Sequence, residues 1–290
     1  MQLVINLFVL SSLYSLICCG YVLIYRSSRV LNLAHGEFMA IGGYFLFTVV
    51  MGLFSDPIPS FVVACVFSLA LGFFVYFFLM KFMAGESVFA AVLVTIALGI
   101  LLRGVMTMIW TSQLRHPLQY LAMKNASHEL MENAVISSFG IIKVVSAVLL
   151  YLGLFFCLKF TRWGLRMRAV GENPLLASQR GVALHKYYAF SWGIGAFSAG
   201  LAGMIQACDS GLDPNMFVIG LKAFPVVLVG GLDSLAGVIP GAFIVALAEI
   251  LTINYISPQA SEAAPFAVLL LMLLIRPWGL FGTKEELERV

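Results

Sequence analysis

Few side chains in this sequence could do chemistry, and three of them lie together near the N-terminus. Asn32, His35 and Glu37 occur beside Gly36 in the stretch RSSRVLNLAHGEFMAIGGYF, residues 26–45. Glycine permits close backbone approach and helix interruption, and an unwound segment at membrane depth is tolerated only where it lines water or is covered by protein. A helix starting near His35 would offer its positive N-terminal end to a carboxylate. If the segment lies at membrane depth, these residues are predicted to line a translocation pathway; otherwise they cap a helix at the inner interface.

Two further charges, Arg103 and Glu249, interrupt long apolar runs. At 1.5 Å per residue, both would lie about 10 Å below the same membrane boundary. A charge there is costly unless it is paired, bound to backbone or hydrated. The hypothesis is that the two pair with each other along the pathway. The alternative is that Arg103 extends to the interface while Glu249 is protonated or hydrogen-bonded locally.

Composition indicates the class of protein that contains these residues. The chain has 290 residues, of which 61% are hydrophobic and only 11% are charged. A soluble domain of this size cannot cover its surface with so few charges, whereas a membrane-embedded one need not. The sequence therefore indicates an all-α polytopic membrane protein that forms one transmembrane domain over residues 1–290.

Apolar runs of about 20 residues, the length that crosses a bilayer, predict the spans. About eight transmembrane helices are expected, together with one short broken segment that contains Pro225. The expected crossings are residues 3–25, 38–54, 61–80, 88–110, 139–158, 187–207, 236–256 and 264–280, and the broken segment is 217–231.

Lysine and arginine orient the chain, because they favour cytosolic loops. An N-terminus outside and a C-terminus in the cytosol gives twelve basic residues on the inner side and four on the outer side. The inner set is Arg26, Arg29, Lys81, Lys159, Arg162, Arg166, Arg168, Arg180, Lys186, Arg276, Lys284 and Arg289, and the outer set is Arg115, Lys124, Lys143 and Lys222.

The inner loop over residues 161–186 contains signals for a short surface helix. Asn173 suits an N-cap, Pro174 suits the first helical position, and Gly181 suits the C′ position that requires positive φ. These signals predict a helix of about seven residues over 174–180. Such a helix either docks a partner protein or simply closes the connection between two spans.

Motifs of hydrolytic enzymes are missing from the sequence. It contains no GxxxxGK[ST], HExxH, GxSxG or CxxC pattern, so a transport or channel function is favoured over an enzyme. The four histidines are scattered and His35 has no evident partner, so no metal site or proton relay is expected. The five cysteines lack metal-ligand spacing and are interpreted as packing residues. No cofactor is expected.

Five segments in order carry a resemblance to a known family. They are NLAHGEFMAIGGY, VTIALGILLRGVMTMIW, RAVGENPLLASQRGV, AFPVVLVGGLDSLAGVIPGAFIVALAE and YISPQASEAAPFAVLLLMLLIRPWGLFG. Together they resemble the membrane permease subunits of the high-affinity branched-chain amino-acid ABC importers, and the length matches the shorter of the two permeases. Asp233 stands where relatives often have Gly, and the sequence before Val30 matches only in hydrophobicity.

The resemblance implies a multi-pass protein of the plasma (inner) membrane of a prokaryote. It implies a second homologous permease subunit, two cytosolic ABC ATPase subunits, an extracytoplasmic substrate-binding protein and a lipid bilayer as partners, and no nucleic acid. It also implies that residues 171–181 contain the helix that couples to the ATPase. The residues expected in this coupling role are Gly171, Glu172, Asn173, Pro174, Ala177, Arg180 and Gly181.

The leading functional hypothesis is a permease for branched-chain or other neutral hydrophobic amino acids, driven by ATP hydrolysed in other subunits. Permeases of the same family for urea or short amides are an alternative. An ion-coupled secondary transporter is another, with Glu249 as its only clear coupling residue, and a membrane scaffold without flux is the third. Residues 111–138 and 207–217 are expected to help dock the binding protein; the alternative is that they are solvated loops.

Overall fold

The structure is a computed structural model, and it describes residues 1–83, 85–131 and 134–283. Lys284 and Arg289 of the expected inner set lie outside the described residues. The described part contains eleven α-helices, four short 3-10 turns and one two-stranded hairpin. The elements are α1 (Gln2–Ser28), α2 (His35–Gly52), α3 (Pro57–Phe78), α4 (Val88–Trp110), β1 (Ser127–Met131), β2 (Ala134–Ser137), α5 (Ser138–Phe160), α6 (Arg162–Glu172), α7 (Pro174–Gln179), α8 (Leu184–Ser210), α9 (Phe217–Gly230), α10 (Leu235–Tyr255) and α11 (Ala264–Ile275).

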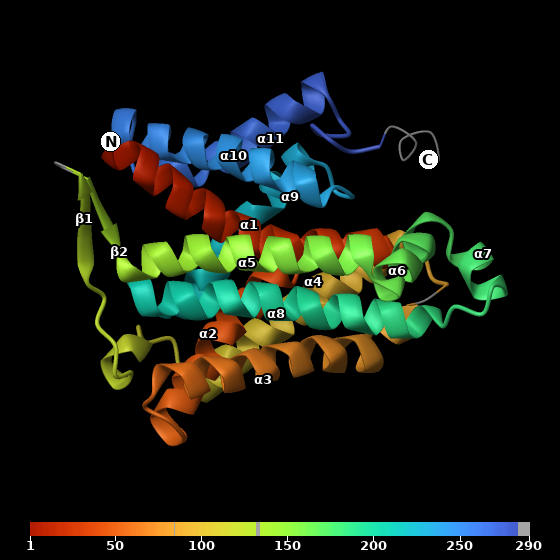
Figure 1. Cartoon of the computed structure of the whole chain (residues 1–290), viewed down its shortest axis with the longest axis horizontal. Helices are drawn as coiled ribbons and strands as arrows, with labels where there is room; N and C mark the ends of the chain where they lie inside the picture. The colour runs from red at the N-terminus through yellow and green to blue at the C-terminus, as the bar shows by residue number, and fades with distance from the viewer. Residues whose placement is uncertain (84, 132–133, 284–290) are drawn as a thin grey trace.

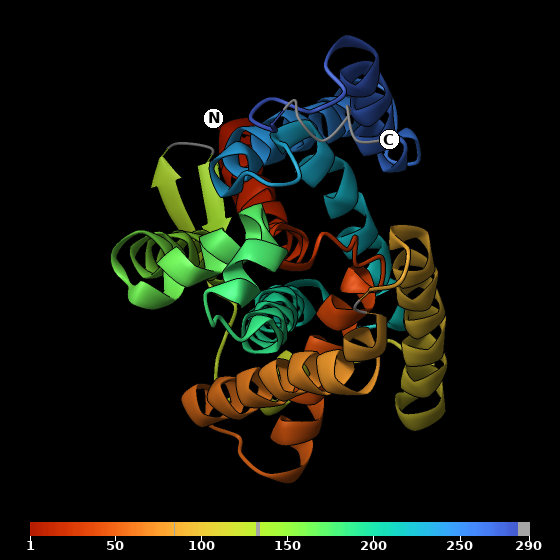
Figure 2. The ribbon, with the colours of Figure 1, turned by 90° about the vertical axis from the view of Figure 1, so that its right-hand side faces the viewer.

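Helices α1, α2 and α8 form the centre of the bundle. Figure 2 looks along the helices and shows α1 and α8 in the middle, with α3, α5, α10 and α11 around them and α4 at one side. Glycines allow the central helices to approach closely, because a Cβ added at Gly42 would overlap the backbone of Gly200, and one at Gly203 would overlap that of Met39. Small residues at helix contacts are the usual means of close packing in membranes.

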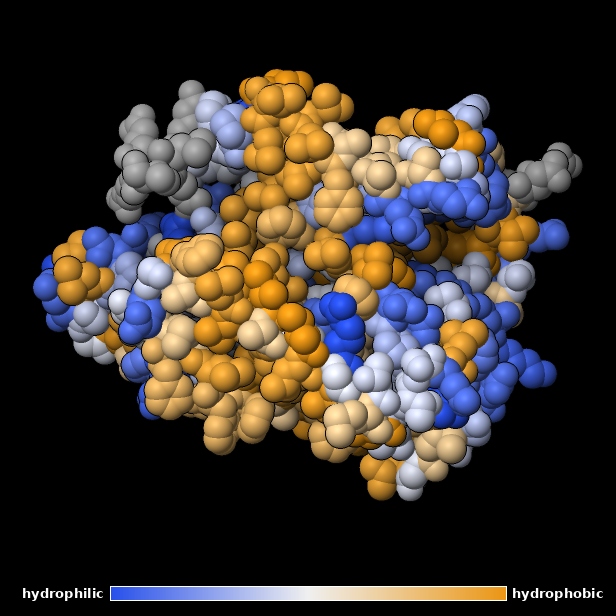
Figure 3. All heavy atoms as spheres, turned by 180° about the vertical axis from the view of Figure 1, so that it is seen from behind, coloured by the Kyte–Doolittle hydropathy of each residue, from blue (hydrophilic) through white to orange (hydrophobic). Residues whose placement is uncertain are grey.

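The peripheral helices expose apolar side chains. In α4 and α5 only 28% and 22% of the apolar window is buried, compared with 72% in both α1 and α8. The outward side chains, among them Ile100, Met108 and Phe156, are large and apolar. Figure 3, which shows the side opposite to that of Figure 1, has a hydrophobic band across the middle and hydrophilic residues toward both ends. This pattern is typical of a protein whose middle faces lipid.

Six helices of the described chain are long and apolar enough to cross a membrane: α1, α3, α4, α5, α8 and α10. The expected crossings at 38–54 and 264–280 are the shorter helices α2 and α11, and α11 ends at Ile275, two residues before Pro277. The broken segment is the single 14-residue helix α9, which keeps Pro225 inside it. A predominantly helical membrane protein is therefore confirmed, while the number of crossings stays a prediction.

Helix α2 begins halfway along α1 rather than at its end. The His35 ring, in the first residue of α2, bonds the Ile17 carbonyl of α1, and Ile17 is near the middle of α1. The chain from Arg29 to Ala34 returns to this level without helical structure. Helix α9 begins at the same level, because Gly220 lies against the backbone of Gly36.

One small β-hairpin departs from the all-α prediction. Strands β1 and β2 pair antiparallel within the polar segment 111–138. The Gln2 side chain completes the outer edge of β2, since it donates to the Val135 carbonyl at 3.0 Å and accepts from the Val135 N–H at 2.8 Å. The strands are too short for their alternation to be distinguished from a polar loop in the sequence.

The two ends of the bundle differ in their elements. Figure 1 places the N-terminus and the hairpin at one end and α6 and α7 at the other. The segment after α11 returns to the α7 end, where Leu280 N–H donates to the Val229 carbonyl and Phe281 N–H to the Gly230 carbonyl. We call these two sides of the bundle the hairpin end and the α7 end.

Candidate functional site

Asn32 and His35 are buried where α2 begins. The Asn32 side-chain oxygen accepts from Ala34 N–H at 3.1 Å, and the His35 Nε2 lies 3.0 Å from the Ile17 carbonyl. The His35 ring also packs 4.2 Å from that of Tyr21, centre to centre. Neither residue lines a described cavity, and both are fully covered by protein. Their contacts fit a role in packing and in the turn before α2 at mid-depth, because no side chain caps α2 itself. A role in the pathway stays a prediction.

Gly36 and Glu37 lie on the other side of α2, at a cavity of about 210 Å³ between α2, α4 and α9. There Glu37 Oε1 accepts from Arg103 Nη2 at 2.5 Å, and the guanidinium lies 3.5 Å from the Phe217 ring centre. The Glu37 side chain is 4% exposed and that of Arg103 is 40% exposed. Arg103 is thus balanced by a carboxylate and an aromatic face while part of it stays open.

The predicted pairing of Arg103 with Glu249 is wrong. Arg103 bonds Glu37, whereas Glu249 Oε1 accepts from Lys222 Nζ at 2.7 Å and its Oε2 accepts from the Tyr14 hydroxyl. Equal depth does not fix lateral position. The true partners, Glu37 and Lys222, are not recognised from the sequence as charges at this depth. The sequence does not reveal that α2 and α9, which contain them, both begin at mid-depth.

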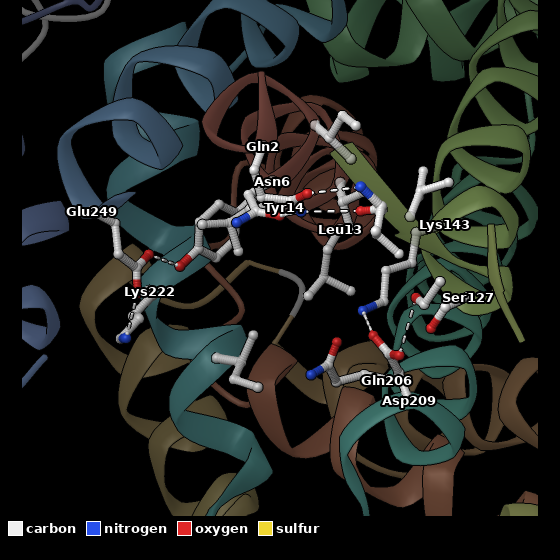
Figure 4. A pocket seen from close by; sticks show the side chains of 17 residues that line it. Gln2, Asn6, Leu13, Tyr14, Ser127, Lys143, Gln206, Asp209, Lys222 and Glu249 are labelled. Carbon is white, nitrogen blue, oxygen red and sulfur yellow. Dashed lines mark hydrogen bonds and ion pairs between the residues drawn. The ribbon is translucent and has the colours of Figure 1, made fainter. Parts of the chain in front are cut away.

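The largest described cavity, of about 670 Å³, lies toward the hairpin end. Figure 4 shows it between two ion pairs on opposite sides: Lys222 with Glu249, and Lys143 with Asp209. Its wall comes from α1, α5, α8, α9, α10 and the hairpin. Uncharged polar residues, among them Asn6 and Gln206, and apolar residues, among them Leu13 and Ile219, line the rest. The volume is within the range of about 300–1,000 Å³ for small-molecule sites.

The second ion pair of this cavity lies at the end of the bundle. Lys143 Nζ is 2.5 Å from Asp209 Oδ2, and Asn125 donates to Asp209 Oδ1 at 3.1 Å. The Lys143 side chain is only 5% exposed. The sequence places Lys143 and Lys222 among the outer basic residues and does not single out Asp209 or Tyr14. The available signal was that Lys143 and Lys222 both lie inside apolar runs, as Arg103 does.

The short helix of the inner loop has the expected caps. Asn173 Oδ1 accepts from Leu176 N–H at 3.0 Å, Pro174 is the first helical residue, and Gly181 has a φ of 80°. Helix α7 covers six residues, with Arg180 as its C-cap. The capping predictions for Asn173, Pro174 and Gly181 are therefore confirmed.

The other residues of the expected coupling set differ in exposure. Glu172 and Arg180 are exposed, while Gly171 is buried against α1, where its carbonyl accepts from Arg29 Nη2 at 3.2 Å. Ala177 is buried in the chain's own core. It therefore supports α7 from beneath rather than forming its outer face.

Comparisons with known proteins agree with this architecture. The family model described as branched-chain amino acid transport system / permease component matches residues 3–275. The chain is 28% identical to the high-affinity branched-chain amino acid transport system permease protein LivH of Escherichia coli K12, over all of this chain and 97% of the relative. It is 27% identical to the corresponding permease protein BraD of Pseudomonas aeruginosa, over all of this chain and 98% of that protein.

A more distant relative has a matching description. The chain is 26% identical to a probable branched-chain amino acid transport permease protein LivH of Methanocaldococcus jannaschii, over 97% of this chain and 92% of that protein. These relatives are permease proteins of transport systems rather than enzymes. Since the family model matches residues 3–275 of this chain, the chain belongs to the branched-chain amino acid transport system permease family.

Proposed function

We propose that this chain is a membrane-spanning subunit of an ABC importer for branched-chain and other neutral aliphatic amino acids, with ATP hydrolysed by separate subunits. The observation that carries the proposal is the family match over residues 3–275, together with relatives that match over nearly their full length and are named as permeases for branched-chain amino acids. A cavity that combines apolar side chains with two charged pairs suits small zwitterions with aliphatic side chains.

The proposal includes an orientation and a set of partners. The hairpin end faces outward toward a substrate-binding protein, and the α7 end faces the cytosol in the inner membrane of a prokaryote. A second homologous permease subunit completes the membrane part. Two cytosolic ATPase subunits bind at the α7 end.

Helix α7 supports a docking role by its surface. Leu175 and Leu176 are 68% and 57% exposed, while Ala177 fixes the opposite side of the helix to the core. Two exposed leucines on a capped six-residue helix form a small apolar projection. Such a projection fits a groove on a partner protein, and we assign that partner as the ATPase subunit.

Reconstitution tests the function. The chain is purified with its partner permease and ATPase subunits, placed in liposomes, and supplied with ATP inside and the binding protein with radiolabelled leucine outside. Uptake that requires both ATP and the binding protein is the expected result. Uptake driven by an ion gradient with this chain alone would instead establish a secondary transporter. ATP-dependent uptake of labelled urea or acetamide, but not of leucine, would establish an amide permease.

A further inference from the structure

The cavity at the hairpin end contains more charge than packing requires. Its two ion pairs are buried at different depths. Lys143 lies five residues into α5, about 8 Å from that helix end, and Tyr14 lies twelve residues into α1, about 18 Å from its start. Two ion pairs whose side chains are largely covered by protein are costly to desolvate. Ionisable residues at membrane depth are rare, and they commonly mark substrate or ion pathways.

The deeper group combines both charges with an apolar surface. Glu249 of α10 accepts hydrogen bonds from Tyr14 of α1 and Lys222 of α9, so this group joins three helices. Leu10 lies one turn before Tyr14 on α1, and Ile219 lies one turn before Lys222 on α9. Both residues line the cavity, as does Leu13 of α1. A cation, an anion and an aliphatic surface therefore adjoin one open space, as Figure 4 shows for Leu13, Lys222 and Glu249.

We propose that this corner of the cavity is a transient binding station for one zwitterionic aliphatic amino acid. Its α-carboxylate binds Lys222, its α-ammonium binds Glu249, and its side chain packs against Leu10, Leu13 and Ile219. An ammonium has three donors and a carboxylate about four acceptor positions. The described contacts use one donor of Lys222 and one position on each oxygen of Glu249, so a ligand can add bonds without breaking the pair.

The arrangement also explains why binding would be weak. The ion pair is satisfied without ligand, so an incoming head group adds bonds to charges that already neutralise each other instead of neutralising a lone charge. A weakly binding station suits a passage from which the substrate must leave again. The inference deepens the proposed function and depends on it only for the identity of the ligand.

Exchanging the two charges distinguishes a role in ligand binding from a purely structural ion pair. The double variant Lys222→Glu with Glu249→Lys keeps an ion pair between α9 and α10 but reverses the order of the charges relative to the apolar surface. We expect unchanged assembly with at least a tenfold loss of leucine uptake in the reconstituted complex. Uptake equal to that of the parent complex would overturn the station and leave the permease function intact. The matched control is Lys159→Met, at the far end of α5 from the cavity.

A second measurement detects binding without transport. It tests the proposal even if the double variant fails to assemble. Leu13→Cys and Ile219→Cys are labelled with a small thiol reagent in the complex, against the parent chain as background. We expect leucine to slow labelling at both positions, and 4-methylpentanoate and 3-methylbutylamine, which each lack one charge, to give no protection. Equal protection by all three compounds, or none by leucine, would overturn the proposal even if ATP-driven uptake is observed.

Discussion

At the residue scale, the partner of each membrane-depth charge is the most informative feature of the molecule. Arg103 and Glu249 lie at similar depth, yet each is balanced by a different helix: Glu37 of α2 and Lys222 of α9. Both partners belong to helices that begin in the middle of the bundle. Each charge is therefore balanced within its own cavity, and no ion pair links Arg103 of α4 to Glu249 of α10.

The first prediction tests this assignment. Arg103→Gln leaves the buried Glu37 carboxylate without its cation, which we expect to cost about 1–3 kcal/mol, less than the roughly 3–5 kcal/mol of a fully buried pair because Arg103 is partly exposed. Adding Glu37→Gln should restore most of the loss, and adding Glu249→Gln should not. Thermal unfolding of the purified complex measures all three variants. Rescue by Glu249→Gln alone would reinstate the pairing that the structure rejects.

At the element scale, helix contacts depend on backbone surfaces that side-chain patterns do not reveal. Gly220 of α9 lies against Gly36, at the start of α2, and a Cβ added at Gly36 would be 2.5 Å from the Phe217 carbonyl. The same contact positions Phe217 beneath the Arg103 guanidinium. Two helix starts packed backbone to backbone thus hold the smaller cavity in shape.

The second prediction compares two glycines of this region. Gly220→Ala should destabilise the protein by about 1–3 kcal/mol, because the added methyl group overlaps the Gly36 backbone. Gly104→Ala is the matched control, since a Cβ there meets open space, and it should be neutral or stabilising by about 0.5–1 kcal/mol through helix propensity. The midpoint of thermal unfolding compares them. Equal midpoints for the two variants would contradict the close packing of α2 and α9.

The third prediction concerns α7. Leu175→Asp should abolish co-purification of the ATPase subunits without lowering the thermal stability of the membrane part, because the side chain is 68% exposed. Leu175→Met keeps an apolar contact and should retain assembly. Ala177→Asp should instead destabilise the chain itself, since Ala177 is buried against the core. Normal assembly of Leu175→Asp would remove the docking role of this helix.

At the scale of the whole molecule, hydropathy and capping were readable from the sequence, while lateral arrangement was not. The long apolar runs are helices with ends within a few residues of those expected, and Asn173 and Gly181 cap α7 as predicted. The contacts of Glu37 and Lys222 were missed because they depend on how far α2 and α9 reach into the bundle. That depth is decided by glycine contacts with other helices, which a single sequence does not display.

The fourth prediction is the orientation of the whole chain. The hairpin and α7 lie at opposite ends (Figure 1), so one labelling experiment with two sites decides it. Two of the four basic residues counted outside, Lys143 and Lys222, are held in ion pairs within the bundle. The outer loops then retain Arg115 and Lys124 against twelve inner basic residues, which strengthens the inside bias.

We therefore expect Glu129→Cys, on β1, to react with a membrane-impermeant maleimide in intact spheroplasts. Gln179→Cys, on α7, should react only after permeabilisation. The parent chain gives the background, because Cys18, Cys19 and Cys208 are buried and Cys65 and Cys157 are partly covered. The opposite accessibility would invert the topology. It would also remove α7 from the cytosol, so the docking of ATPase subunits at α7 would fail with it.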